Sequence, residues 1–383
     1  MDRHRNTPVV VAARRTPVAT AGRGLADVDV DGLAAPVLRA LVDDLGDSGP
    51  EVAEVLLGNC TGPGGNPARR AALAAGLGVG VPGTTVDGQC GSGLEAVRLA
   101  AQAVRSGSAD LVLAGGVESA STAPRRSWRG DAVPYDRAPF APAGFADPDM
   151  GPAAEAVAHR CGITRDRQDA YAARSHARAV AAQRSGVFDA ELVAMEGVTA
   201  DDRPRPRLDA ALLSRFPPAF ASDGTVTAGS SCGVSDGAGA VAVVPERVRA
   251  ALGLPGLAVR SCVVRGVDPA LPGLGPIPAV IEALALAGLG LGDVDTFEVT
   301  EAFAAQVLAF TDALGLDALG ADADRVCPDG GAIALGHPWG ASGALLVVRL
   351  FSSLVRRDGG RVGVATCAVG GGLGVAVVVE RAG

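Results

Sequence analysis

The residue best suited to nucleophilic chemistry is Cys90, in the run Thr84-Thr-Val-Asp-Gly-Gln-Cys90-Gly-Ser-Gly-Leu-Glu-Ala-Val-Arg. A strand-prone segment and a glycine turn precede it, and a helical stretch without proline follows, so Cys90 stands where a helix begins. Free amides and the dipole at a helix start favour a thiolate, and we expect them to lower the thiol pKa from its usual value of about 8.5. A buried structural cysteine is the alternative, because that is the commonest fate of a free cysteine.

His337 is the candidate partner of this thiol, in Gly330-Gly-Ala-Ile-Ala-Leu-Gly-His337-Pro-Trp-Gly-Ala-Ser-Gly-Ala. This glycine-rich turn leads into a second helical stretch. An imidazole that faces Cys90 could take the thiol proton and then donate to a developing oxyanion. The alternative is a histidine that only satisfies the hydrogen bonds of its own turn.

Internal similarity indicates how these two segments are positioned. Val241-Ala-Val-Val-Pro-Glu resembles Val375-Ala-Val-Val-Val-Glu, and the helical stretch from Ser92-Gly-Leu resembles the one from Ser342-Gly-Ala. Such repeats predict two similar halves. Because each candidate residue precedes the equivalent helix of its half, packing about a pseudo-twofold axis would bring Cys90 and His337 together.

Near-continuous apolar strands alternate with amphipathic helices, which predicts an α/β fold whose mostly parallel sheets are covered by helices on both faces. We expect residues 1–120 plus 233–256 to form the N-terminal half and residues 257–383 the C-terminal half. Residues 121–232 form an inserted region, rich in proline and arginine, with one helix around Arg165–Arg184. This insert predicts a lid over an anionic ligand; a solvated, loop-rich excursion is the alternative.

Composition excludes several classes of function. Apolar residues make up 48% of the 383 residues, which excludes an extended disordered chain. Aromatic residues are only 3%, the net charge is −8 and no basic run occurs, so we expect no nucleic-acid partner. The sequence contains no lysine, which excludes Schiff-base chemistry.

Location and metal binding follow from similar arguments. No apolar run reaches membrane-spanning length, and Met1–Arg5 leads straight into a strand-like segment instead of a secretory signal. The seven cysteines are scattered and contain no C-x-x-C pair. We therefore expect a reduced, cytoplasmic protein with no membrane partner, no disulfide framework and no metal site.

These segments together resemble the thiolase family across essentially the whole chain. The other matching pieces are Gly224-Thr-Val-Thr-Ala-Gly, Gly275-Pro-Ile-Pro-Ala, Glu301-Ala-Phe-Ala-Ala-Gln and Gly370-Gly-Gly-Leu-Gly. The resemblance implies a five-layered αβαβα fold and a homodimer or homotetramer. It also implies a coenzyme A thioester, or an acyl-carrier phosphopantetheine, as substrate, with no permanently bound cofactor.

The resemblance assigns roles to individual residues. It implies that Cys90 is acylated, that His337 activates it and helps to form an oxyanion hole, and that the backbone amides of Cys90 and Gly370 form a second hole. Thr300 stands where the family has an asparagine before Glu-Ala-Phe. A threonine hydroxyl could hold the water of the first hole, with one donor instead of two.

One departure affects the second half of the family's reaction. Thiolases carry a second catalytic cysteine in a C-x-G-G-G strand end, and the ungapped match puts Ala368 at that position. Cys367 lies one residue earlier. On a strand, an offset of one residue turns the side chain to the opposite face, so we expect that only a β-bulge could re-aim Cys367.

The expected binding path of the thioester carrier also differs from the family pattern. Met150, Arg215 and Cys232 are the candidate contacts with the carrier, and Cys232 replaces a serine. Asp149 replaces a histidine beside Met150, and Pro217 replaces an arginine of the nucleotide end. An acidic residue near a polyanionic carrier weakens binding unless nearby arginines compensate.

Taken together, these residues predict an acyltransferase that forms acyl-Cys90 from an acyl thioester. Carbon–carbon bond formation, or thiolytic cleavage of 3-ketoacyl thioesters, is its leading form. Acyl transfer to an oxygen, nitrogen or sulfur nucleophile, or decarboxylative condensation with a substrate on a carrier protein, would avoid α-proton abstraction. A non-catalytic scaffold subunit that binds a partner enzyme or an acyl carrier protein is the alternative of another class.

Overall fold

The strands of the computed structural model, which describes residues 5–383, form one mixed sheet. In spatial order the sheet runs β4-β3-β5-β6-β1-β7-β10-β9-β8, and β2 pairs with β6. The strands are β1 (Pro8–Arg15), β2 (Ala19–Thr20), β3 (Glu54–Gly58), β4 (Gly83–Val86), β5 (Val112–Ser119), β6 (Ser235–Pro245), β7 (Gly256–Gly266), β8 (Thr296–Val299), β9 (Val362–Val369) and β10 (Leu373–Ala382). The expectation for the N-terminal run concerns Met1–His4 as well, and these residues lie outside the described part of the chain.

Helices cover the sheet and connect its strands. They are α1 (Val30–Leu45), α2 (Pro67–Ala74), α3 (Ser92–Ser106), α4 (Met150–Cys161), α5 (Arg165–Arg184), α6 (Ala210–Leu213), α7 (Glu246–Leu252), α8 (Pro276–Ala287), α9 (Ala304–Ala313), α10 (Ala332–Leu335) and α11 (Trp339–Phe351). Within residues 5–383, no helix is both long enough and apolar enough to span a lipid bilayer.

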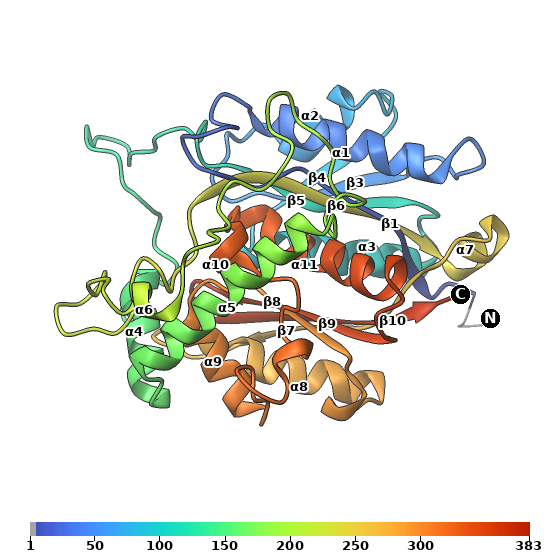
Figure 1. Ribbon diagram of the computed structural model, residues 1–383. Helices are drawn as coiled ribbons and strands as arrows, with labels where there is room; N and C mark the ends of the chain where they lie inside the picture. The colour runs from blue at the N-terminus through green and yellow to red at the C-terminus, as the bar shows by residue number, and fades with distance from the viewer. Residues whose placement is uncertain (1–4) are drawn as a thin grey trace.

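The sheet is continuous through the short pairing of β1 with β7, but its strands fall into two groups with helices between them. The layers are therefore helix, strands, helix, strands, helix, as expected (Figure 1). Helices α1 and α2 cover the outer face of the N-terminal strands, α3 and α11 lie between the two groups of strands, and α8 and α9 cover the outer face of the C-terminal strands. The alternation along β6 shows how one strand serves two layers. Val241 and Val243 belong to the core around α3 and α11, whereas Ala242 and Val244 belong to the core around α1.

The expectation of mostly parallel sheets is wrong. Only β3 with β4, β3 with β5, and β8 with β9 pair in parallel; the other pairings of the described strands are antiparallel. The first strands of the two halves, β1 and β7, join the halves antiparallel, and a tight turn at Gly370–Gly372 makes a hairpin of β9 and β10. The continuous apolar runs reflect burial on both faces, which helices provide whatever the strand direction.

The segment between β5 and β6 carries α4, α5 and α6 and lies along the side of the layers (Figure 1). The helix expected around Arg165–Arg184 is confirmed as α5, whose N-cap Thr164 accepts a hydrogen bond from the Arg167 amide. Helix α5 packs against α9 and α10, which directly precedes the turn that carries His337.

Candidate active site

Cys90 lies in a short 3-10 turn, Gln89–Gly91, that leads directly into α3. The turn is held by its own side chains: Asp87 Oδ1 accepts hydrogen bonds from the Gln89 amide and from Gln89 Nε2, both at 3.1 Å. Ser92 Oγ donates to the Gln89 carbonyl at 2.6 Å. These contacts hold Gln89 in the left-handed region, with φ of 51°, and present Cys90 at the helix start.

His337 lies between α10 and α11, and its ring is held from one side. Its backbone amide donates to the Gly233 carbonyl at 3.0 Å, and its Nδ1 lies 2.6 Å from Ser342 Oγ. Ser342 Oγ in turn donates to the Pro338 carbonyl at 3.1 Å, so its oxygen accepts a hydrogen bond from Nδ1–H of His337. This assigns the lone pair to Nε2, which is buried without a hydrogen-bond partner among the described residues.

The starts of α3 and α11 pack against each other through glycine. A Cβ at Gly93 would lie 2.8 Å from the Gly340 carbonyl oxygen, and a Cβ at Gly116 of β5 would also collide with that oxygen. Cys90 precedes Gly93 by three residues, and His337 precedes Gly340 by three. The structure therefore brings the two candidate residues to adjacent helix starts, one from each half.

The expectation of a lowered Cys90 pKa is wrong. Burial raises the pKa of the Cys90 thiol, and the neighbouring Cys367 and Cys232 thiols and the Glu118 carboxylate raise it further. Burial of a thiol can shift its pKa by several units, whereas a helix start offers a smaller stabilisation. Cys90 is therefore a thiol in the free protein, and burial lowers the pKa of His337 to about 4, so its imidazole is neutral.

Strand β9 pairs with β10 without a register shift, so no bulge re-aims Cys367. Cys367 packs in the core around α3 and α11, and its Sγ lies 3.0 Å from Thr300 Oγ1. Ala368 is half-buried and, as the next residue of the strand, points to the other face. Gly370 is buried beneath the ring of Phe140, to which a Cβ at Gly370 would come within 2.7 Å.

Two of the candidate carrier contacts, Met150 and Cys232, are linked through packed aromatic side chains. Met150 begins α4, and a Cβ on the next residue, Gly151, would overlap the ring of Phe220. Phe220 packs edge-on against Phe303 at 5.9 Å between ring centroids. The residue before Phe303 accepts a hydrogen bond from the Cys232 amide at 2.9 Å, whereas Arg215 is exposed.

The buried carboxylate of Glu118 holds two parts of this site together, and it was not identified from the sequence. Glu118 Oε2 accepts hydrogen bonds from the amides of Cys60 at 3.1 Å and Gly340 at 2.9 Å, and its Oε1 accepts from Asn59 Nδ2 at 3.1 Å. It therefore ties the end of β3 to the start of α11. The sequence did contain a signal for this role, an acidic residue inside the apolar strand Val112–Ser119. A buried carboxylate needs hydrogen-bond partners, so such a residue indicates a structural contact.

Glu301 plays a similar part at the glycine-rich turn that precedes His337. Its carboxylate accepts hydrogen bonds from Tyr171 at 2.8 Å, Ser175 at 2.6 Å and the Ile333 amide at 3.2 Å. It thus fastens α5 to the glycine-rich turn. Among residues 5–383, no group of three or more histidine, cysteine or acidic side chains is arranged to hold a metal ion.

Comparison with known proteins is consistent along the whole chain. Residues 8–247 match the family described as thiolase, N-terminal domain, and residues 255–381 match thiolase, C-terminal domain. The chain is 43% identical to an acetyl-CoA acetyltransferase of Pseudomonas aeruginosa, over 97% of this chain and 99% of that protein. It is 40% identical to the 3-ketoacyl-CoA thiolase 1, peroxisomal, of Arabidopsis thaliana, over 98% and 88% respectively.

A solved structure agrees with these matches. The crystal structure of the Bacillus anthracis acetyl-CoA acetyltransferase superposes with a TM-score of 0.91 at 35% sequence identity. The similarity covers 100% of both chains, so it includes both helix starts and the insert between β5 and β6.

Proposed function

The chain belongs to the thiolase family, and we propose that it is an acyltransferase that takes an acyl group from a thioester onto Cys90. The acyl group then passes to the α-carbon of a second thioester, or to the thiol of coenzyme A in the thiolytic direction. The observation that carries this proposal is the contact between Gly93 and Gly340, which sets the two helix starts side by side.

Acylation starts from the neutral thiol of Cys90 and the neutral imidazole of His337. As Cys90 Sγ attacks the thioester carbonyl, its proton passes to Nε2 of His337, whose lone pair is available. A thiol whose pKa is raised needs this base, because little thiolate is present beforehand. The backbone amides of Cys90 and Gly370 stabilise the tetrahedral oxyanion, and the imidazolium then protonates the departing thiolate.

The second step, removal of an α-proton from the second thioester, lacks the base that the family pattern supplies. Ala368 has no ionisable group at the position of the family's second cysteine, and Cys367 stays in the core. Acyl transfer to an oxygen, nitrogen or sulfur nucleophile therefore remains the second candidate, since it needs no α-proton abstraction. Thr300 is proposed to hold water at the first oxyanion hole.

The carrier is proposed to be coenzyme A or an acyl-carrier phosphopantetheine. The apolar side chains packed between Met150 and Cys232, among them Phe220, suit contact with a pantetheine arm. The exposed Arg215 is proposed to contact the anionic end of the carrier. The insert, residues 121–232, would act as the lid over this arm. Residues 1–120 plus 233–256 and residues 257–383 are proposed as the two halves that it covers.

Assembly and location form part of the same proposal. Trp128, Val133 and Phe145 of the insert are exposed large apolar side chains, which supports a homodimer or homotetramer. All seven cysteines are free thiols, which suits a reducing cytoplasm.

Intact-protein mass spectrometry after incubation with acetyl-CoA tests the proposal. The wild-type protein should gain one acetyl group, located on Cys90 by peptide mapping, and Cys90→Ser should gain none, because its hydroxyl is a far weaker nucleophile than the thiol. Cys161→Ser is the matched control, since Cys161 is exposed on α4, and it should be labelled like the wild type. No adduct on the wild type, or an equal adduct on Cys90→Ser, would refute the proposal.

A further inference from the structure

The ring of Phe140 covers the turn at the end of β9. It belongs to residues 137–149 of the insert, which we call the Phe140 loop. A Cβ at Gly370 would lie 2.7 Å from Cε2 and 2.8 Å from Cδ2 of the ring, and a Cβ at Gly371 would lie 3.0 Å from the Phe140 carbonyl oxygen. The ring therefore packs on Gly370 with no space for one more carbon atom.

The same turn touches the segment that carries Cys90. A Cβ at Gly91 would lie 2.8 Å from Cγ2 of Val369. Gly91 directly follows Cys90, and Val369 directly precedes Gly370. An acyl group on Cys90 whose oxygen is bound by the Gly370 amide would therefore lie close to the Phe140 ring.

A guanidinium group holds this ring in place. Arg137 Cζ lies over the Phe140 ring, 4.5 Å from its centroid, where the π electrons attract a cation. Nη1 of Arg137 lies 3.1 Å from Asp147 Oδ1, which also accepts a hydrogen bond from the Phe140 amide at 3.1 Å. The Asp147 carboxylate thus binds both the backbone of Phe140 and the cation on its ring.

Asp149 completes this group of contacts. Arg137 Nε donates to Asp149 Oδ1 at 2.7 Å, and Asp149 is the N-cap residue of α4, directly before Met150. The negative charge that the sequence places beside Met150 is therefore opposed by a positive one. The ion pair also ties the Phe140 loop to the start of α4.

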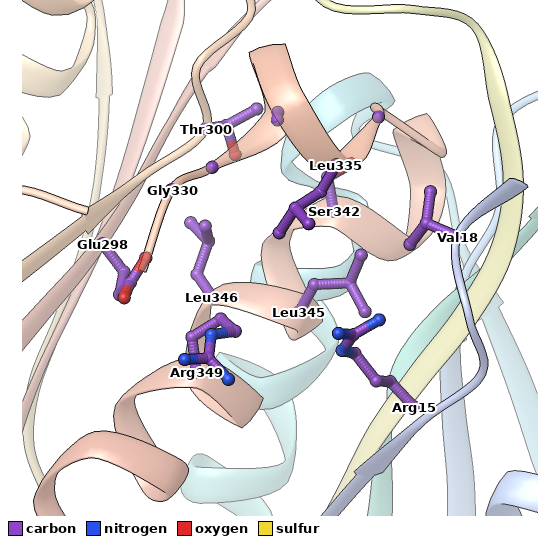
Figure 2. A pocket seen from close by; sticks show the side chains of 13 residues that line it. Arg15, Val18, Glu298, Thr300, Gly330, Leu335, Ser342, Leu345, Leu346 and Arg349 are labelled. Carbon is purple, nitrogen blue, oxygen red and sulfur yellow. The ribbon is translucent and has the colours of Figure 1, made fainter. Parts of the chain in front are cut away.

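The cavity between β1, β8 and α11 offers a longer acyl chain no space. Figure 2 shows Val18, Leu345 and Leu346 around this cavity, whose volume is about 40 Å³. Neither Cys90 nor Gly370 is among its lining residues. This cavity therefore does not serve as the acyl pocket.

We propose that Phe140 limits the acyl group on Cys90 to acetyl. A longer chain that extends toward the turn has to displace the ring from Gly370, and it then loses the contacts between ring and turn. Arg137 and Asp149 are positioning residues, because they act through the ring.

The inference rests on the proposed acyltransferase function and names its acyl donor. In the step that selects the donor, the bond from Cys90 Sγ to the acyl carbon forms and the carbon–sulfur bond of the thioester breaks. The thiol proton passes through His337 to the departing thiolate, so the step is balanced without a further reactant.

Acylation rates with donors of two lengths test this limit. Rapid quenching followed by intact-protein mass spectrometry measures the second-order rate constant for acyl-Cys90 formation from acetyl-CoA and from butanoyl-CoA. The wild-type protein should react at least about tenfold faster with acetyl-CoA, and Phe140→Ala should raise the butanoyl-to-acetyl ratio about 10–200-fold. Phe145→Ala is the matched control, because Phe145 lies in the same loop but is 66% exposed, and its ratio should equal that of the wild type.

Phe140→Leu keeps an apolar side chain over the turn and should shift the ratio in the same direction by a smaller factor. It decides the question if Phe140→Ala does not fold. A wild-type protein that takes butanoyl as fast as acetyl, or a wild-type ratio in the folded Phe140 variants, would overturn the inference. Absence of an acyl adduct from either donor would refute the proposed function instead.

The role of Asp149 has a separate test in the same assay. Asp149→Asn removes the charge that pairs with Arg137 and should raise the butanoyl-to-acetyl ratio about twofold to fivefold. Asp149→Glu keeps the charge and should stay near the wild-type ratio. An unchanged ratio in Asp149→Asn, or an equal rise in Asp149→Glu, would overturn the positioning role.

Discussion

At the scale of single residues, the environment of Cys90 and His337 matters more than their positions at helix starts. Burial raises the pKa of Cys90 and lowers that of His337, so the free protein holds a neutral thiol beside a neutral imidazole. A pre-formed thiolate–imidazolium pair would instead react with any electrophile that enters. The neutral pair becomes nucleophilic only as the proton moves to Nε2 in the presence of a carbonyl.

This protonation state predicts how Cys90 alkylation depends on pH. Iodoacetamide reacts with the thiolate, so the rate constant should keep rising with pH through about pH 9, because the thiol pKa lies above its ordinary value. Peptide-level mass spectrometry in a Cys161→Ser background, which removes the exposed thiol, measures this rate. A plateau near pH 7 would show that the helix start prevails over burial.

At the scale of elements, the site depends on two helices that approach more closely than side chains would permit. Gly93 of α3 and Gly116 of β5 both face the carbonyl oxygen of Gly340. Glu118 then binds the Gly340 amide from β5, which locks the start of α11 in place. Backbone contacts between the halves therefore fix the positions of the two helix starts, and these in turn fix where Cys90 and His337 lie.

Gly93→Ala tests this contact. The added methyl would force α3 and α11 apart, and we expect a loss of about 1–3 kcal/mol in the free energy of unfolding. Acylation should fall more than tenfold, because about 1 Å of misplacement costs two orders of magnitude in rate. Denaturant unfolding and the acetyl-CoA mass assay measure the two effects.

Gly80→Ala is the matched control for that substitution. A Cβ at Gly80 meets no atom within 4 Å, and the residue needs no left-handed backbone. Both measurements should therefore stay at the wild-type level. If Gly93→Ala behaves like Gly80→Ala, the helix starts are free to adjust and the contact does not position the site.

At the scale of the whole molecule, buried ion pairs join the halves to the insert. Glu191 of the insert binds Arg15 of β1 at 2.7 Å and also Arg349 of α11, while Asp201 of the insert binds Arg15 at 2.7 Å. Arg349 also binds Asp329 of the C-terminal half. Although burial opposes it, Arg349 and Arg15 hold the pKa of Glu191 below its ordinary range, and Arg349 and Arg357 do the same for Asp329.

Glu191→Gln should therefore destabilise the fold by about 3–5 kcal/mol at pH 7, because it leaves two buried guanidinium groups short of charge. The lowered carboxyl pKa also sets a pH dependence. Its stabilisation is full above the unfolded-chain pKa of about 4.3 and is lost as the pH falls through the lower folded value. Wild-type unfolding free energy should thus decline more steeply below about pH 5 than that of Glu191→Gln.

Glu282→Gln serves as the comparison for this measurement, because the ion pair of Glu282 with Arg265 is partly exposed. We expect a change of at most about 1 kcal/mol. A Glu191→Gln protein as stable as Glu282→Gln would mean that the buried network does not join the insert to the halves.

The types of residues that are close together in the sequence determined several features of this protein. The α5 bounds, the helices that begin just after Cys90 and His337, and the internal repeat depend on neighbouring residues, and the sequence alone predicts them. The apolar strands and amphipathic helices also predicted sheets covered by helices on both faces, whereas the five layers were implied by the resemblance to the thiolase family.

Only the tertiary structure decided the strand directions and the protonation of the site. Strand direction is set by which edges meet, as where β1 joins β7. The pKa of Cys90 depends on Cys232 and Cys367, and that of Glu191 on Arg349 and Arg15, all distant in sequence. Desolvation and charge act through space, so their balance exists only once the halves and the insert are packed together.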